Sequence, residues 1–105
     1  MKKTFNERCY KILKKVPRGK VTTYKALAEA LGTKAYRAVG NAMKNNKMPD
    51  EIPCFKVIKS DGSIGGYMGN NPKNIKIKIK RLEAEGIIIK EGKIDLIRYS
   101  YNFNN

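Results

Sequence analysis

Two short helical segments that meet at Gly32 and Thr33 place the strongest constraint on how this chain can fold. Residues 24–31 are rich in alanine and leucine, which favour helix, and Thr23 can accept amide hydrogens that are free at a helix start. Gly32 ends this segment, and Thr33 can cap a third helix over about residues 34–45. Two such helices have the dimensions of a helix-turn-helix.

The second helix of this pair carries many small side chains. They are Ala35, Ala38, Gly40 and Ala42. Packing against a core explains some of them, and a helix that enters a DNA groove explains the rest. Tyr36 and Arg37 stand out from this bare background. We therefore expect DNA contacts from these two side chains, and from Lys34 and Thr23 beside them.

The N-terminal segment has the pattern of an amphipathic helix. Apolar residues recur at helical spacing, namely Phe5, Cys9, Ile12, Leu13 and Val16. The helix is expected to begin at about Thr4 and to be ended by Pro17 and Gly19. Cys9 falls on the apolar stripe and is expected in the core.

The second half of the chain has less decisive patterns. Residues 60–63 read as a turn, and the glycine-rich stretch 64–70 lacks the motifs of phosphate-binding loops. Residues 75–80 alternate isoleucine with lysine like a strand, yet Asn71 and Pro72 open a helix well. The pattern leaves both structures open. Residues 87–89 and 93–97 predict a short hairpin, and residues 98–105 predict a polar tail that frays.

Charge and composition exclude several kinds of protein. The 105 residues suffice for one small domain, and 23 basic against 9 acidic residues give a net charge of +14. Residues 8–49 hold eleven basic residues and one acid. A solvated lysine-rich surface or a phosphate-binding face explains this excess, and the charge alone leaves DNA, RNA and an acidic membrane open. The absence of an arginine-rich, aromatic amphipathic helix makes the membrane the weakest.

The missing residue types are equally informative. The chain has no histidine and two cysteines outside any C-x-x-C pair, which argues against histidine-based catalysis and a structural metal. No apolar run is long enough to span a membrane, and the N-terminus lacks the pattern of a signal peptide. These features predict a soluble, cytoplasmic protein without a structural metal site.

Four separated motifs, in order, carry a resemblance to a known family. They are Val16–Tyr24 (VPRGKVTTY), Ala38–Met43 (AVGNAM), Ile52–Ile58 (IPCFKVI) and Asp61–Tyr67 (DGSIGGY). Together they resemble the C-terminal DNA-binding and active-site domain of the O6-alkylguanine-DNA alkyltransferases, also called methylated-DNA–protein-cysteine methyltransferases. The resemblance runs from about Phe5 to Ile89. It implies one α/β, mainly α, winged helix-turn-helix-like domain over residues 1–105, without the family's N-terminal domain.

The resemblance implies a DNA-repair reaction that consumes the protein. The family grips duplex DNA through the minor groove, flips out the damaged guanine and moves the alkyl group from O6 to a cysteine, without a cofactor. Here that cysteine would be Cys54. The implied partner is duplex DNA containing O6-alkylguanine, bound by a monomer, with other repair proteins as further partners. The family fold also favours a helix over residues 72–84.

The family's site residues map onto this chain one by one. Arg37 would fill the gap left in the base stack, Tyr24 would press on the phosphate of the rotating nucleotide, and Asn46 would act as a hinge. Glu85 matches a buried catalytic carboxylate. The pocket around the flipped base would comprise Pro53, Phe55, Lys56, Gly65, Gly66 and Tyr67.

One departure from the family motif bears directly on activity. The family has Pro-Cys-His-Arg-Val, whereas this chain has Phe55 and Lys56 after the cysteine. Phenylalanine cannot accept a proton, so the relay from the thiol to Glu85 is cut. The positive surroundings of Lys56 and Lys59 could activate Cys54 instead. The alternatives are a non-catalytic protein that binds and flags the lesion, and a plain winged-helix DNA-binding module.

Overall fold

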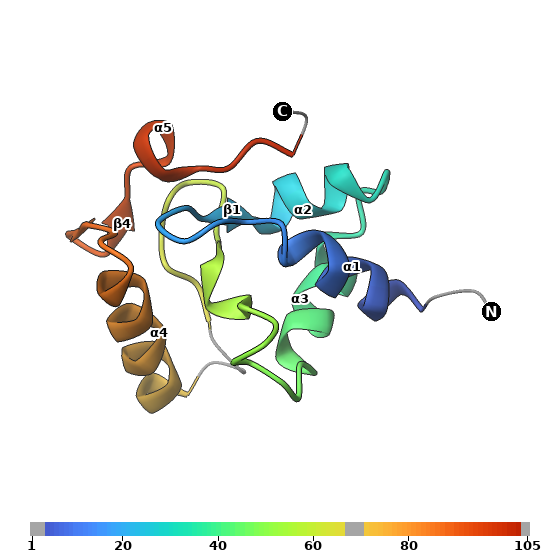
Figure 1. The fold of residues 1–105 in the computed structure, drawn as a ribbon, viewed down its shortest axis with the longest axis horizontal. Helices are drawn as coiled ribbons and strands as arrows, with labels where there is room; N and C mark the ends of the chain where they lie inside the picture. Colours follow the sequence, from blue (N-terminus) through green and yellow to red (C-terminus); the bar gives the residue numbers. More distant parts are fainter. Residues whose placement is uncertain (1–3, 67–70, 104–105) are drawn as a thin grey trace.

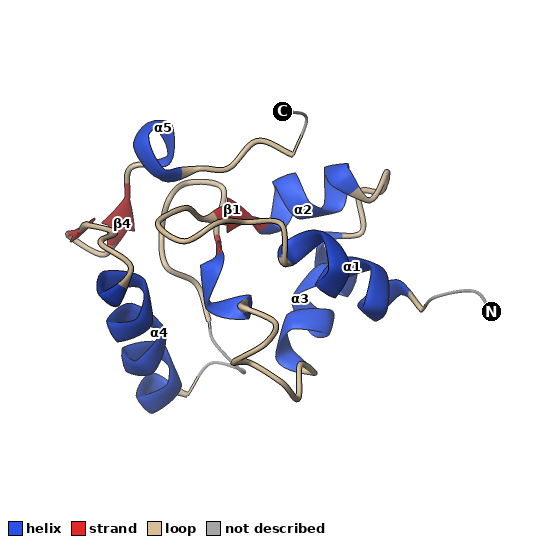
Figure 2. Cartoon of the chain, in the orientation of Figure 1, coloured by secondary structure: helices blue, strands red, loops and turns tan. Residues whose placement is uncertain are grey.

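The computed structural model describes residues 4–66 and 71–103, and it places a group of short helices opposite one longer helix (Figure 1). The helices are α1 (Phe5–Leu13), α2 (Tyr24–Ala30), α3 (Tyr36–Lys44), α4 (Pro72–Ala84) and α5 (Leu96–Tyr99), with a 3₁₀ turn η1 (Cys54–Lys56). The strands are β1 (Thr22–Thr23), β2 (Val57–Ile58), β3 (Ile89–Lys90) and β4 (Lys93–Ile94). Figure 2 shows that helix predominates, which confirms the mainly α class.

The strands β1 and β2 form a short parallel pair between the short helices α1–α3 and the longer helix α4 (Figure 1). Thr22 pairs with Val57 and Thr23 with Ile58. β1 leads directly into α2, and β2 directly follows η1. The pair therefore joins the start of the helix-turn-helix to the segment that carries Cys54.

Side-chain caps begin three of the helices where the sequence predicts. The Thr4 hydroxyl accepts from the Glu7 amide at 3.1 Å, and the Thr23 hydroxyl accepts from the Ala26 amide at 3.0 Å. At α4 the Asn71 side chain accepts from the Lys73 amide at 2.9 Å. These bonds satisfy donors that a helix start leaves free. α1, however, ends at Leu13, short of the expected stop at Pro17.

The turn between α2 and α3 differs in one detail from the prediction. Gly32 adopts a left-handed φ of +74°, as expected of the residue that ends α2. α3 starts at Tyr36 and not at Lys34, because the Thr33 hydroxyl accepts from the Ala35 amide two residues later. That bond closes a local turn, so the expectation that Thr33 caps the helix is wrong.

The isoleucine and lysine alternation at residues 75–80 lies inside α4, which confirms the helix and excludes the strand. Ile75, Ile79 and Leu82 face the core together with Lys78. The exposed face carries Lys73, Lys76, Ile77 and Lys80.

The described C-terminal residues form a hairpin, a short helix and backbone hydrogen bonds to Val21. The hairpin pairs Ile89 with Ile94, but residues 95–97 are not strand, since the Asp95 side chain accepts from the Ile97 amide and starts α5. In the segment expected to fray, Tyr99 and Tyr101 pair with Val21, which precedes β1: the Val21 amide donates to the Tyr99 carbonyl, and the Tyr101 amide to the Val21 carbonyl, both at 2.8 Å. Residues 104–105 of that segment lie outside the described residues. The rings of Tyr99, Tyr101 and Phe103 pack in or against the core.

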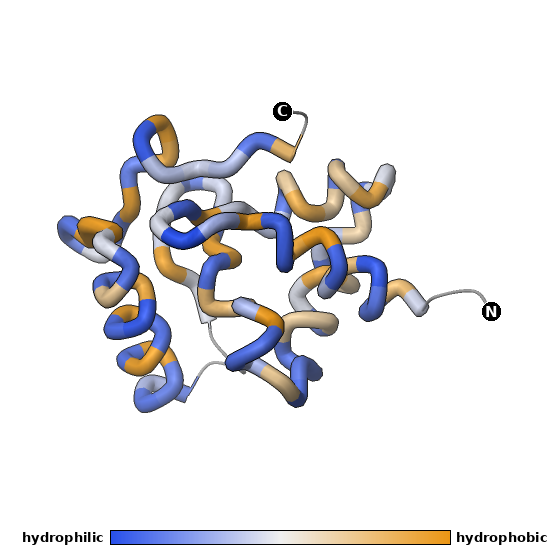
Figure 3. Tube along the Cα trace, viewed as in Figure 1, coloured by the Kyte–Doolittle hydropathy of each residue, from blue (hydrophilic) through white to orange (hydrophobic). Residues whose placement is uncertain are grey.

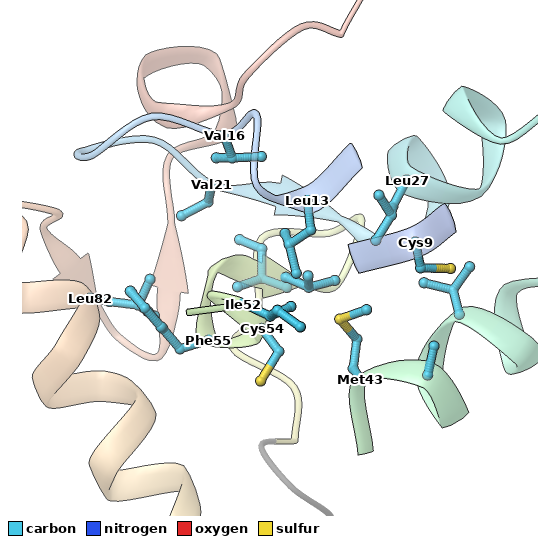
Figure 4. Close-up of a cluster of buried hydrophobic side chains, with 14 of the residues drawn as sticks. Cys9, Leu13, Val16, Val21, Leu27, Met43, Ile52, Cys54, Phe55 and Leu82 are labelled. Carbon is cyan, nitrogen blue, oxygen red and sulfur yellow. The ribbon is translucent and has the colours of Figure 1, made fainter. Parts of the chain in front are cut away.

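The apolar core contains residues from α1, α2, α3 and α4. Figure 3 shows hydrophobic residues in every helix, and the close-up in Figure 4 draws Cys9, Leu13 and Leu27 near Met43 and Ile52. Cys9 is fully buried, as predicted. Among residues 4–66 and 71–103, no helix is both long and apolar enough to cross a membrane.

Candidate active site and nucleic-acid interface

Cys54 lies at the edge of the core, at the start of η1. Pro53 precedes it, and the Cys54 amide donates to the Ile52 carbonyl at 2.7 Å, which turns the chain sharply. The residue is 4% exposed. In Figure 4 its sulfur points away from Ile52 and from the centre of the cluster. The thiol is therefore shielded from water, yet it is directed outward from the core.

Asn46 connects the end of α3 to the cysteine segment. Its side chain is buried and donates to the Ile52 carbonyl at 2.8 Å, while its oxygen accepts from the Met48 amide at 2.9 Å. The same side chain also hydrogen-bonds Cys54, which lowers the pKa of the thiol. The residue predicted as a hinge thus holds both the loop and the thiol.

Opposing effects act on the ionisation of Cys54. Burial raises the pKa of the thiol and is the largest effect, because a thiolate loses its hydration inside the protein. The Asn46 hydrogen bond lowers the pKa, as do the positive charges of Lys78 and Arg81. The net effect is a raised pKa of Cys54, because burial outweighs the hydrogen bond and the charges that act in the opposite direction.

Lys78 is a component of the site that sequence reasoning missed. Its side chain is fully buried, and its Nζ donates to the carbonyls of Val57, Ile64 and Gly66 at 2.7, 2.6 and 2.9 Å. Burial lowers the pKa of Lys78 to about 7. Once residues 72–84 are taken as helix, the spacing of Lys78 from Ile75 and Leu82 would have placed it on the inner face.

Phe55 occupies the position of the family's histidine. Its ring is buried in the core cluster, and Figure 4 draws it beside Leu82. The guanidinium carbon of Arg81 lies 4.6 Å from the ring centroid, and Nζ of Lys56 lies 5.8 Å from it. These are cation–π distances. An apolar ring with cations nearby thus replaces a titratable one.

Lys56 and Glu85 form a buried ion pair, here called the Lys56–Glu85 clasp. Lys56 Nζ lies 3.2 Å from Glu85 Oε1 and donates to the carbonyls of Val16 and Pro17. Glu85 Oε1 also accepts from the Gly19 amide at 2.9 Å. The clasp ties η1 and the end of α4 to the loop between α1 and β1. The charge of Lys56, expected to act on Cys54, is therefore balanced by Glu85.

Tyr24 and Gly65 meet beside the site. A Cβ placed on Gly65 would lie 3.7 Å from the Tyr24 ring. The backbone φ of Gly65 is +72°, a value that residues other than glycine rarely adopt. Burial and the nearby Cys54 raise the pKa of Tyr24. Gly66 contributes its carbonyl to Lys78. Tyr67, the remaining predicted pocket residue, lies outside the described residues.

The outer face of α3 is basic and open. Arg37, Asn41 and Lys44 follow one another at helical spacing and are exposed, and a Cβ on Gly40 between them would meet no atom within 4 Å. Tyr36 and Lys34 are exposed beside this stripe, whereas Thr23 is buried in the cap of α2. On the inner face, the Tyr10 hydroxyl donates to the Ala42 carbonyl at 2.6 Å and anchors the helix.

The described part of the chain contains no group of three or more Cys, Asp or Glu residues that could hold a metal ion.

Comparison of this sequence with known proteins identifies its family. The model of the "6-O-methylguanine DNA methyltransferase, DNA binding domain" matches residues 4–87. A bifunctional methyltransferase/endonuclease of Picrophilus torridus is 50% identical over 94 residues, which cover 89% of this chain and 30% of that protein. A methylated-DNA–protein-cysteine methyltransferase of Pyrobaculum aerophilum is 43% identical over 83 residues, covering 79% of this chain and 53% of that protein.

A solved structure matches over nearly the full length of both chains. It is S. pombe Atl1 in complex with damaged DNA containing O6-carboxymethylguanine, with a TM-score of 0.83 and 30% identity, covering 93% of this chain and 94% of the other. The curated relatives are longer, and this chain spans from about a third to half of the two named above. The motifs, the fold and the matched residues agree, and the chain belongs to the 6-O-methylguanine DNA methyltransferase family through its DNA-binding domain.

Proposed function

We propose that this chain binds duplex DNA that contains O6-alkylguanine and transfers the alkyl group to Cys54. The observation that carries the proposal is Cys54 at the family's acceptor position, at the start of η1 and with its sulfur directed away from the core in Figure 4. The Asn46 hydrogen bond and the charges of Lys78 and Arg81 lower the pKa of this thiol, against the larger effect of burial. A cysteine kept only for packing needs neither a hydrogen-bond donor nor nearby cations.

The transfer is a single displacement. Cys54 loses its proton to solvent, and the thiolate attacks the alkyl carbon on O6. A sulfur–carbon bond forms while the carbon–oxygen bond breaks, and its electron pair remains on the guanine, which takes up a proton from solvent. The product is a thioether at Cys54 and an unmodified guanine. Because a thioether is not a leaving group under these conditions, each molecule reacts once.

Access to O6 requires the base to leave the stack. Unstacking costs a few kcal/mol, and a side chain that fills the gap offsets part of that cost. Arg37 is exposed on α3 beside Gly40, where the helix is narrow enough to approach DNA closely. In our proposal Arg37 fills the gap, and Lys34 and Lys44 contact phosphates. The relatives' names and the DNA complex of Atl1 support a DNA partner for this chain.

Activation of the thiol cannot follow the family's relay. Phe55 accepts no proton, and the interactions of Glu85 go to Lys56 and Gly19. We propose that Glu85 holds the fold of the site through the Lys56–Glu85 clasp. Activation then depends on the charges and hydrogen bonds that act on Cys54 directly.

The proposal is tested with a duplex that carries one O6-methylguanine. After incubation with the protein, the DNA is digested and its O6-methylguanine is quantified. Wild type and Cys9→Ser should remove the modified base, whereas Cys54→Ser should bind the duplex and leave the base unchanged. Loss of O6-methylguanine with Cys54→Ser would contradict the proposal.

A non-catalytic lesion-binding role is the second candidate. Two observations favour it: burial raises the pKa of the Cys54 thiol, and Phe55 replaces the histidine. Lesion-selective binding without loss of O6-methylguanine would support this role, and binding that ignores the lesion would leave a plain DNA-binding module.

A matched pair of variants tests the proposed contact of Arg37 in either case. Arg37→Ala should reduce the preference for modified over unmodified duplex more than it reduces total affinity. Lys34→Ala should weaken binding to both duplexes equally. An equal loss on both duplexes with Arg37→Ala would reduce Arg37 to a phosphate contact.

A further inference from the structure

The outer face of α4 carries a row of lysines that the proposed function does not use. Lys73, Lys76 and Lys80 are exposed, and their spacing places them within about 60° of one another around the helix axis. The row covers about 10 Å of that axis. These three residues are here called the α4 lysine stripe.

The charge of the α4 lysine stripe is not compensated in the part of the chain that the structure describes. The ion pairs formed there are the Lys56–Glu85 clasp and the contact of Arg81 with Asp50. Residues 71–82 contain no acid at all. The stripe is therefore a row of three positive charges of a single sign on one helix face.

The position of the stripe does not stabilise α4. A helix N-terminus carries a partial positive charge, and the first turn of α4 holds Lys73 and no acid. Lys76 and Lys80 are four residues apart, a spacing at which like charges repel each other. In α1, by contrast, Lys11 lies in the last turn, where the helix dipole favours a cation.

A solvated lysine-rich face is the simplest alternative explanation. Such faces ordinarily mix both signs, as on α2, where the exposed Lys25 precedes the exposed Glu29 by four residues. Glutamate and glutamine form helix about as well as lysine, so helix propensity does not explain the choice of lysine at all three positions. A stripe that the free helix does not benefit from is explained by a negatively charged partner.

Among such partners, nucleic acid fits the stripe better than a membrane does. A helix that lies on a membrane needs a wide apolar face beside its cations. In α4 the side chains of Ile75, Ile79 and Leu82 pack in or against the core, and Ile77 is the exposed isoleucine. One strand of B-DNA carries a phosphate about every 3.4 Å of its axis, so a row of about 10 Å can contact about three phosphates.

The stripe does not share a face with α3. Figure 1 draws α4 and α3 on opposite sides of the segment that carries η1 and β2. α4 packs against η1, and its buried residues are Lys78 and Leu82, so the stripe is directed away from the rest of the domain. A duplex on α3 would have to bend sharply to reach it, and DNA resists bending over lengths of about 150 base pairs. The stripe is therefore open to a different duplex.

We propose that the α4 lysine stripe binds the phosphates of a second DNA duplex while α3 holds the first, so that the protein passes directly from one duplex to the other. The inference rests on the proposed contact of α3 with DNA. Phosphate contacts carry no sequence information, so the second contact is independent of the lesion. Direct passage shortens the search for a rare modified base, because most of the DNA that the protein meets is unmodified.

The first test measures how fast the protein leaves a labelled, unmodified duplex as unlabelled duplex is added in increasing excess. Direct passage makes this rate rise with the concentration of unlabelled duplex, whereas simple dissociation gives a constant rate. Wild type should show the rise. The variant Lys73→Gln/Lys76→Gln/Lys80→Gln should reduce its slope at least about tenfold, because it loses three phosphate contacts. A constant rate in wild type would overturn the inference, and that result requires no variant.

A control with the same net charge is Lys11→Gln/Lys14→Gln/Lys15→Gln, which removes three exposed cations in and just after α1. It should keep the slope of wild type. An equal loss of slope in both triple variants would assign the effect to net charge and overturn the inference. Circular dichroism checks that both variants fold, which we expect because glutamine and lysine have similar helix propensities.

A second test detects the bridged state itself. One unmodified duplex carries a fluorescence donor and another carries an acceptor. Wild type should give energy transfer when duplex is in excess, and the signal should disappear when protein is in excess, because each duplex then has its own protein. Energy transfer that keeps rising with protein would indicate association between copies of the protein, and it would overturn the inference.

The outcomes separate this inference from the proposed function. Wild type that removes O6-methylguanine but leaves the labelled duplex at a constant rate would contradict only the role of the stripe, and an acidic protein surface would then be its remaining partner. Passage between duplexes without loss of O6-methylguanine would contradict only the transfer reaction. If the triple variant of the stripe no longer binds a single duplex, α4 is the main DNA contact and the inference is overturned.

Discussion

The Lys56–Glu85 clasp makes a quantitative prediction about stability. Lys56→Met removes the ion pair at 3.2 Å and both hydrogen bonds to the Val16 and Pro17 carbonyls. It leaves Glu85, whose side chain is 11% exposed, with the Gly19 amide as its partner in the clasp. Glu85→Gln is milder, because the new amide oxygen can still accept from Gly19 and from Lys56.

The expected magnitudes follow from burial. Removing one partner of a buried pair costs about 3–5 kcal/mol, which we expect for Lys56→Met. Changing a charged acceptor to a neutral one should cost Glu85→Gln about 1–3 kcal/mol. A loss of 3 kcal/mol is a large part of the stability of a small domain, and it should lower the melting temperature by about 12 °C or more.

Urea unfolding followed by circular dichroism measures these losses. Asp50→Asn is the matched control, because it breaks the Arg81–Asp50 pair, whose carboxylate is 94% exposed. That variant should cost about 0.5 kcal/mol. The double variant Lys56→Met/Glu85→Gln should cost less than the sum of the single variants, since the two side chains interact directly. The reasoning is refuted if Lys56→Met costs no more than Asp50→Asn.

Three further predictions concern other parts of the site and fold. Thr22→Val should raise the free energy of unfolding by about 1 kcal/mol in thermal melts, because the buried Thr22 hydroxyl has no hydrogen-bond partner among the described residues, and a loss of stability would contradict this. Asn46→Ala should cost about 2–3 kcal/mol in urea unfolding and slow methyl transfer, since it removes the bonds to Ile52, Met48 and Cys54; a full transfer rate would refute the thiol contact. Because burial lowers the pKa of Lys78 from 10.5 to about 7, the folded chain holds fewer protons than the unfolded chain between these values. The free energy of unfolding of wild type, relative to Lys78→Met, should therefore rise above pH 7 by up to about 1.4 kcal/mol per pH unit, and a flat difference would contradict this sign.

Local signals in the sequence were sufficient for much of the fold. The caps at Thr4, Thr23 and Asn71 depend on residues within three positions, and each begins its helix as predicted. Thr33 shows the limit of such reasoning, because its hydroxyl can close a turn or cap a helix, and the sequence does not decide between them. Asp95 is similar, since its cap converts the end of an expected strand into α5.

Long-range packing determined what the sequence left open. The alternation at residues 75–80 fits both a strand and a helix, and the packing of Ile75, Ile79 and Leu82 on the core decides for the helix. The same packing buries Lys78, which a solvated lysine-rich stretch would not suggest. The C-terminal segment contains polar residues, yet Tyr99 and Tyr101 pair with Val21 through the backbone.

Some features of the candidate site were predicted from the sequence, and others are visible only in the structure. Cys54 and Asn46 follow from the family resemblance, and a hydrogen bond from the Asn46 side chain lowers the pKa of the Cys54 thiol. The motif order gives no indication that Glu85 pairs with Lys56 or that Arg81 stacks on Phe55. Those contacts join residues from separate elements, and they determine which charges remain available to the thiol.

The central claim is that Cys54 accepts the alkyl group, and intact-mass analysis tests it most directly. The protein is incubated with an excess of O6-methylguanine duplex, weighed, and digested to locate the modification. We predict the mass of a single methyl group per molecule, on the peptide that contains Cys54, with no further gain at longer times. An unchanged mass, or a methyl group on Cys9, would contradict the account.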